Sequence, residues 1–113
     1  MAATIIPRFY VASGFWLWLL DRFGFDGITL PWGAIHMREA FFSDPWLREH
    51  ELQHVRQIQR LGRVRFCVRY VYEMVRYGYW QSPLEEEARH AERENGDRRA
   101  LAMGYRVPVA GAG

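Results

Sequence analysis

The feature that most constrains this chain is the pentapeptide His50-Glu51-Leu52-Gln53-His54. Two histidines four residues apart lie on one face of an α-helix, one turn above the other, so their imidazoles can bind the same ion. The glutamate beside the first histidine can reach a water molecule at that ion. This H-E-x-x-H pattern is typical of zinc hydrolases, and it has that meaning only on a helix with a third ligand nearby.

The residues around the motif predict a helix over about 45–61. Asp44 can accept hydrogen bonds from the first turn, and Pro45 suits the first helical position. Apolar residues recur through the segment at helical spacing, and Gly62 is a typical C-terminal stop. The motif is therefore expected inside a helix with a defined start and end.

The composition narrows the class of protein. A chain of 113 residues forms one domain, and 50 % hydrophobic residues exclude a largely disordered one. Every basic residue is an arginine, and the arginines alternate with acids around a formal charge of +2, so nucleic-acid binding is not expected. The single cysteine, Cys67, excludes an intramolecular disulfide and a cysteine-rich zinc site, and we expect it to pack as a small hydrophobe.

The N-terminal region contains a run of uncharged, mostly apolar residues over 9–20. A membrane-spanning helix needs about 20 such residues, and no cleavage site of the signal-peptide kind follows the run. We expect a helix over 9–23 that is buried against the core, and a cytoplasmic location is favoured over secretion. The aromatic side chains of Phe15, Trp16 and Trp18 make contact with a membrane surface the less favoured alternative.

Two short β-like segments, 27–30 and 34–37, flank the turn Pro31-Trp32-Gly33. They predict a hairpin or a bent strand pair over about 27–37, directly before the motif helix. An exposed strand edge near a metal can receive a substrate backbone by strand addition. His36 belongs to this segment and is expected as a half-buried strand residue.

Two further helices are expected after the motif, over about 64–77 and 83–95. The second has Ser82 as its cap, Pro83 at its first position and Glu85, Glu86 and Glu87 in its first turn. Gly96 is expected to end or kink this helix, which can resume to Met103, and 104–113 forms a frayed or loosely docked tail. The fold class is therefore α+β, mostly helical, with one domain over 1–113.

A catalytic zinc site needs a third protein ligand beside the two histidines. The candidates are His36, His90 and the acids of the 85–87 triplet. The residues alone do not choose among them, because Ser82-x-x-Glu85 also fits a capping box.

The motif, together with Gln57, Gly62 and the run 79–88, resembles the small bacterial and phage gluzincin-type metallopeptidases. Their signature is H-E-x-x-H followed by a helix that bears E-x-E-A. The run 28–33 and the Asp44-Pro45 pair are also similar to the segments that lead into such domains, so the resemblance spans roughly residues 27–90.

The resemblance implies a minimal zincin-like domain in which Glu85 is the third zinc ligand and Glu87 is an acid that supports the ligands. Many gluzincins have an aspartate four residues after the ligand glutamate, where it orients a zinc-bound histidine. This chain has Arg89 there. Because metal-bound histidines need a partner on the other ring nitrogen, Glu87, Glu73 or a backbone carbonyl is expected instead.

The resulting hypothesis is a zinc metallopeptidase acting on a peptide or protein. His50, His54 and Glu85 hold Zn²⁺, which lowers the pKa of water from 15.7 to about 7. Glu51 takes the proton and delivers it to the leaving amine. A donor to the tetrahedral oxyanion is also needed. The candidates for this donor are Tyr70, Tyr72, Tyr77, Tyr79, His36 and His90.

Two alternatives stay open at this point. The site could bind zinc only to brace a non-catalytic interaction domain, with His90 as the best candidate for a fourth ligand. The hydrolase could instead act on the peptide of the cell wall, because nothing in the sequence separates the two kinds of amide substrate.

Overall fold

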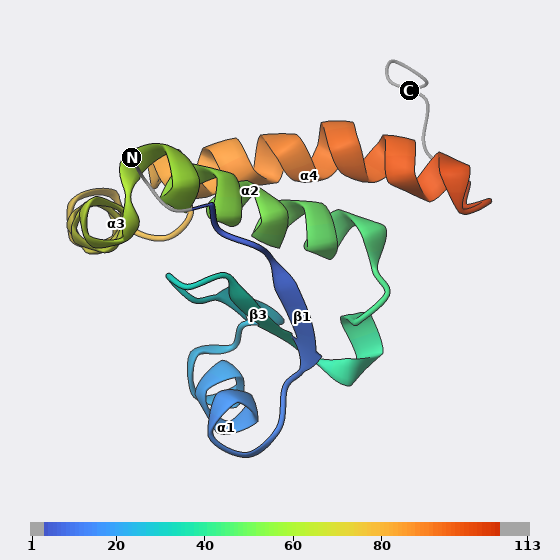
Figure 1. Ribbon diagram of the computed structural model, residues 1–113, viewed down its shortest axis with the longest axis horizontal. Coiled ribbons are helices and arrows are strands. Elements are labelled where there is room, and N and C mark those ends of the chain that lie inside the picture. The colour runs from blue at the N-terminus through green and yellow to red at the C-terminus, as the bar shows by residue number, and fades with distance from the viewer. Residues whose placement is uncertain (1–3, 107–113) are drawn as a thin grey trace.

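The computed structural model describes residues 4–106, which form an α+β fold that is mostly helical, as expected (Figure 1). The expected tail over 104–113 therefore lies largely outside the described residues. The elements in chain order are β1 (Arg8–Val11), α1 (Gly14–Phe23), β2 (Gly27–Thr29), β3 (Ala34–Met37), the 3₁₀ helix η1 (Glu39–Phe41), α2 (Pro45–Leu61), α3 (Arg63–Tyr77) and α4 (Pro83–Ala102).

The three strands form one sheet in the order β1-β3-β2. The expected hairpin is confirmed, because β2 pairs antiparallel with β3 and Ile28 lies opposite His36. On the other side of β3, β1 pairs in parallel, with Phe9 opposite Ile35. Because β3 is paired on both sides, β1 and β2 are the edge strands of this sheet. The one that contacts the motif helix α2 extensively is β2.

The prediction of a buried helix over 9–23 is wrong in two respects. Residues 8–11 form strand β1, because pairing with β3 overrides the helical reading of this apolar run, and the helix begins only at Gly14. The helix is also not buried: Leu20 alone is buried, whereas Phe15 and Trp18 are exposed. Among the described residues, no helix combines the length and apolar character needed to cross a bilayer.

Helices α2 and α4 lie side by side and make the most extensive contact between any two elements (Figure 1). The hydrophobic core lies between the sheet and the helices. It consists of Ile5, Ile35, Met37, Val55, Ile58, Phe66 and Leu84. Helix α3 covers the core mainly with Phe66, which is one of its only two buried residues.

The predicted break of α4 at Gly96 is wrong, because the helix runs without interruption to Ala102, which agrees with the expected resumption to Met103. Gly96 instead allows α2 and α4 to approach closely. A Cβ atom at this position would lie 2.6 Å from Cδ1 and 3.0 Å from Cα of Trp46. The same tryptophan donates a hydrogen bond of 2.7 Å from Nε1 to Oδ1 of Asp97.

Both long helices are capped by a carboxylate, but only one of the two caps follows from local sequence. Asp44 accepts from the backbone N–H groups of Trp46 and Leu47, each at 2.9 Å, and so starts α2 as expected. At α4, Ser82 is the N-cap residue as expected, but its side chain makes no cap hydrogen bond to the helix. Oε1 of Glu73, on α3, accepts from Leu84 N at 2.8 Å and from Ser82 Oγ at 2.9 Å.

Candidate metal centre

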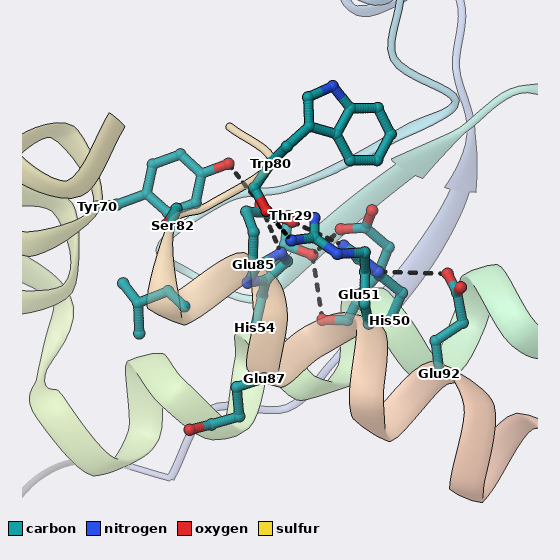
Figure 2. Close-up of polar contacts among 12 residues, drawn as sticks. Thr29, His50, Glu51, His54, Tyr70, Trp80, Ser82, Glu85, Glu87 and Glu92 are labelled. Carbon is teal, nitrogen blue, oxygen red and sulfur yellow. Dashed lines mark hydrogen bonds and ion pairs between the residues drawn. The ribbon is translucent and has the colours of Figure 1, made fainter. Parts of the chain in front are cut away.

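The motif histidines meet a glutamate of α4 in the interior of the protein (Figure 2). His50 and His54 project from one face of α2, and Glu85 projects toward them from the first turn of α4. Nε2 of His50 lies 3.0 Å from Oε2 of Glu85, and Nε2 of His54 lies 3.1 Å from Oε1. All three residues are buried, with exposed fractions between 2 % and 6 %.

These three residues could hold a metal ion, because their donor atoms all lie within 4.8 Å of one another. A tetrahedral ion with metal–nitrogen and metal–oxygen bonds of about 2.0–2.1 Å holds its ligand atoms about 3.3 Å apart. The two nitrogen–oxygen distances, each to a different oxygen of Glu85, are 3.0 and 3.1 Å, slightly shorter than that value. Neutral imidazole nitrogens with a carboxylate oxygen are also a donor set that divalent transition metals accept.

The electrostatics of the cluster favour a cation. Burial opposes ionisation of Glu85, but hydrogen bonds from His50, His54 and Tyr70 hold the pKa of its carboxyl well below the usual range. Burial also opposes charge on His50, yet Glu85 and Glu92 together raise the pKa of His50 to about 10. The pKa of His54 is raised as well, mainly because Glu85 outweighs burial. The carboxylates therefore attract positive charge into the space between the ring nitrogens.

Gln57 fixes the proton on His54. Its side-chain N–H₂ donates to the carbonyl of Leu84 at 2.9 Å and to Oε1 of Glu87 at 3.2 Å, so its oxygen must face the histidine. That oxygen lies 2.9 Å from Nδ1 of His54. An amide oxygen only accepts, so Nδ1 carries the hydrogen and the Nε2 lone pair of the neutral ring is free for a metal.

Glu92 takes the corresponding position at His50. Its Oε1 lies 3.3 Å from Nδ1, on the far side of the ring from Glu85 (Figure 2). The contact is an ion-pair distance without hydrogen-bond alignment. The carboxylate nevertheless faces the ring nitrogen that does not approach Glu85, which is the arrangement expected around a metal-binding histidine.

The expected partners of the histidines were wrong. Glu87 contacts neither ring and acts one step away, by accepting hydrogen bonds from Gln53 and Gln57. Glu73 caps α4 instead. Arg89, which replaces the usual aspartate, donates to the backbone carbonyl of Trp80 and so braces the loop before α4.

Glu51 lies beside the cluster and is held from the sheet. Oγ1 of Thr29, on the edge strand β2, donates to Oε2 of Glu51 at 2.5 Å. Gly27 on the same strand leaves space for this carboxylate, since a Cβ there would lie 3.1 Å from Oε1. The carboxylate is therefore oriented by a strand rather than by its own helix.

A cavity of about 310 Å³ opens on the cluster. His50, Glu51, His54 and Glu85 form its polar end, and the rest is mostly apolar. The remaining lining residues are Phe25, Gly27, Ile28, Thr29, Leu30, Pro31, Phe66, Cys67, Tyr70, Val71, Met74 and Tyr79. The cavity thus runs from the polar cluster along β2 and one side of α3.

Two of the six candidate oxyanion donors line this cavity. The hydroxyl of Tyr70 donates to Oε1 of Glu85 at 2.6 Å. Burial, with the nearby carboxylates, raises the pKa of both Tyr70 and Tyr79 above the usual range, so both hydroxyls remain protonated donors. Figure 2 shows Tyr70 reaching toward Glu85 from α3.

The other candidates lie elsewhere, which corrects the expectation for each. Tyr72 and Tyr77 line a separate groove on the other side of α3. His36 stacks between Tyr10 and Trp16. His90 is exposed and pairs with Glu94 on its own helix. Cys67, expected to be packed in the core, is exposed at the cavity wall.

Sequence reasoning overlooked Gln57 and Glu92 as partners of the histidines. The signal that could have found them is helical spacing. Gln57 follows His54 by three residues, and Glu92 follows Glu85 by two helical turns, so each shares a face with a candidate ligand.

Comparison with protein-family models, with curated proteins and with solved structures finds no match for this chain.

Proposed function

We propose that this protein is a zinc-dependent metallopeptidase with a minimal zincin-like fold. The observation that carries the proposal is the buried group of His50, His54 and Glu85, with Glu51 beside it at the end of an apolar cavity. Two histidines and one carboxylate are a recurring ligand set of hydrolytic zinc sites, which leave a further position for water or substrate.

The chain's own residues supply the groups that amide hydrolysis needs. When bound, Zn²⁺ acts as a Lewis acid and lowers the pKa of water to about 7. Glu51 accepts a proton from the attacking water and passes it to the leaving nitrogen as the carbon–nitrogen bond breaks. Thr29 holds Glu51 in position for both transfers.

The tyrosines and the edge strand complete the proposed site. Tyr79 keeps its hydroxyl proton and can donate to the oxygen that becomes negative in the tetrahedral intermediate, whereas Tyr70 uses its one proton to hold Glu85. Strand β2 lines the cavity and pairs with β3 on one side, which leaves its other edge for an extended substrate backbone. The apolar walls favour a substrate with an apolar side chain near the cleaved bond.

Metal content tests the ligand assignment. Purified wild-type protein is expected to contain one zinc ion per chain by elemental analysis, which also measures iron because the same ligand set accepts it. Glu85→Ala should lose the ion. Glu86→Ala is the matched control, since Glu86 is exposed on the same helical turn, and it should keep the ion. Equal metal content in the two variants would contradict the assignment.

Activity is tested with a peptide library that includes both ordinary peptides and cell-wall peptides with D-residues. Wild-type protein should cleave members with an apolar residue beside the scissile amide. Glu51→Gln should keep the metal and lose about 10²–10⁴-fold in turnover, as expected for a general base. A Glu51→Gln variant with undiminished hydrolysis would exclude Glu51 as the base.

The alternative of a purely structural zinc site finds less support. Such sites are usually closed by four protein ligands. His90, the best fourth candidate, is exposed and paired with Glu94, and within the described residues the cluster contains no cysteine and no histidine beyond His50 and His54. The same hydrolysis assay separates the two functions.

A further inference from the structure

Helix α3 carries an apolar face that no other described element covers. Val64, Val68, Val71 and Val75 are between 62 % and 84 % exposed. At about 100° per residue, the four side chains fall within an arc of about 60° on the helix surface. Only Phe66 and Glu73 of this helix are buried, and they lie on the opposite side.

The apolar face is bordered by positive charge. Arg65, Arg69 and Arg76 occupy the adjoining side of the helix and are exposed. The one acid of α3, Glu73, is buried and paired with Arg69. A groove of about 690 Å³ follows this border, where Arg65 and Arg69 stand beside apolar walls that include Val64, Val68 and Tyr72.

The opposite border of the apolar face is the metal-site cavity. Cys67, Val71 and Met74 line that cavity, and Val71 also belongs to the exposed valine row. The helix surface therefore passes in order from arginines to exposed valines to the wall of the candidate active site.

We propose that α3 binds the surface of an anionic lipid bilayer. The valine row enters the boundary between headgroups and acyl chains, and the arginines contact lipid phosphates, as in amphipathic helices that lie in a membrane surface. The cavity then opens at the bilayer surface, so its substrate is a polypeptide segment held at or near the membrane. This second part rests on the proposed peptidase function, whereas lipid binding does not.

The charge pattern favours a bilayer over a second copy of the chain. An antiparallel pairing of two copies through the valine row would bring the arginine borders together, and α3 offers no free acid to balance them. Anionic phosphates supply the missing negative charge. Tyr72, which is 59 % exposed, stands beside the valines in the groove, and an amphipathic ring of this kind suits the headgroup level of a bilayer.

Co-sedimentation of the full-length protein with vesicles tests the lipid contact. Vesicles of phosphatidylcholine and phosphatidylglycerol in equal parts should bind the wild type, and vesicles of phosphatidylcholine alone should bind it at least tenfold more weakly. The double substitution Val68→Glu with Val75→Glu should lower binding to the anionic vesicles by at least tenfold, because charges at the acyl boundary are unfavourable. Arg65→Gln should lower it about fivefold, the effect of one arginine near an anionic surface.

Leu101→Glu is the matched control, since it places the same charge on an exposed apolar residue of α4. It should bind vesicles like the wild type, and thermal melting should show that all variants fold. Unchanged binding by the valine double variant would overturn the proposal. Loss of binding in Trp18→Glu alone would move the contact to α1 and overturn it too, as would a stable wild-type dimer that ignores vesicles and dissociates in the valine double variant.

The substrate inference is tested with one fluorogenic peptide in free form and acylated on anionic vesicles. Wild-type protein should cleave the anchored form at least tenfold faster, and the valine double variant should cleave both forms alike. Equal wild-type rates on both forms would overturn delivery at the membrane while leaving the peptidase intact. Absence of cleavage of either form, with vesicle binding retained, would count against the proposed function alone.

Discussion

Helices α3 and α4 follow one another in the chain but have opposite surfaces. Helix α4 buries Glu85 together with small apolar residues such as Ala88 and Ala91 against α2. Helix α3 buries little and exposes a row of valines. Residue type alone would assign these two helices the other way round, with the valine-rich one in the core.

The difference teaches that burial in this protein follows hydrogen-bonding partners as much as hydrophobicity. A buried carboxylate is costly unless it is paired and hydrogen-bonded. Glu85 meets two histidines and a tyrosine, so its burial is compensated. The valines of α3 carry no polar group, so their exposure leaves no hydrogen bond unmade.

Glu73 is where the two helices depend on each other most, and removing it should have the largest effect on stability. Glu73→Ala leaves Ser82 Oγ and the Leu84 N–H without their acceptor in a buried position. At roughly 1–3 kcal/mol for each of the two unsatisfied donors, the free energy of unfolding should fall by about 2–6 kcal/mol. Chemical denaturation measures this free energy. The control Glu86→Ala, at an exposed position in the first turn of α4, should change it by less than about 0.5 kcal/mol.

The contribution of the Glu73 carboxylate to the free energy of unfolding depends on pH. Burial acts against its charge, but the Leu84 N–H, Arg69 and Ser82 together lower the pKa of Glu73 below the ordinary value of 4.5. Its stabilising effect is therefore present above pH 4.5 and lost as the pH falls through the folded-state pKa. The difference in free energy of unfolding between wild type and Glu73→Gln should become smaller below pH 4.5. A larger difference there would contradict the capping role of Glu73.

Two glutamates on the polar face of α4 lie at the same distance from a histidine nitrogen, one at the candidate metal site and one at the surface. Oε1 of Glu92 lies 3.3 Å from a nitrogen of His50, and Oε1 of Glu94 lies 3.3 Å from a nitrogen of the exposed His90. Glu92→Gln should weaken zinc binding 10–100-fold, or about 1.4–2.7 kcal/mol, in a competition titration with a chelator. Glu94→Gln should leave the affinity unchanged. Equal effects would mean that Glu92 does not position His50.

The smallest effect is expected on the exposed face of α3. Val75→Ala should change the free energy of unfolding by no more than about 0.5 kcal/mol, because the side chain is 84 % exposed. Val55→Ala removes the same two methyl groups from the core and should cost about 2 kcal/mol. A similar loss in the two variants would show that the valine row of α3 is covered in the free protein.

Local signals were sufficient for much of the fold and for the centre of the site. The Asp44-Pro45 start, the Gly62 stop and the hairpin over 27–37 are all encoded within a few residues, and each was predicted correctly. The meeting of His50, His54 and Glu85 was expected from helical spacing and from the E-x-E-A resemblance. Each of these features depends on short-range chemistry that a sequence displays directly.

The features that sequence reasoning missed all depend on contacts between distant segments. Strand β1 exists because β3 offers a free edge, a fact that residues 8–11 do not contain. The α4 cap comes from another helix. Glycine ends many helices, but Gly96 lies within one because the backbone of α2 passes too close for a side chain.

That close passage has a consequence for the chemistry. Gly96 lies eleven residues after Glu85, about 16 Å along the helix axis. Trp46 fills the space against this glycine and lies one turn before His50 on α2, so this contact helps set the distance between the two helices that carry the candidate ligands. The geometry of the candidate site therefore depends on a residue outside it, because a larger side chain at position 96 would push α4 away from Trp46 and shift Glu85 relative to the two histidines.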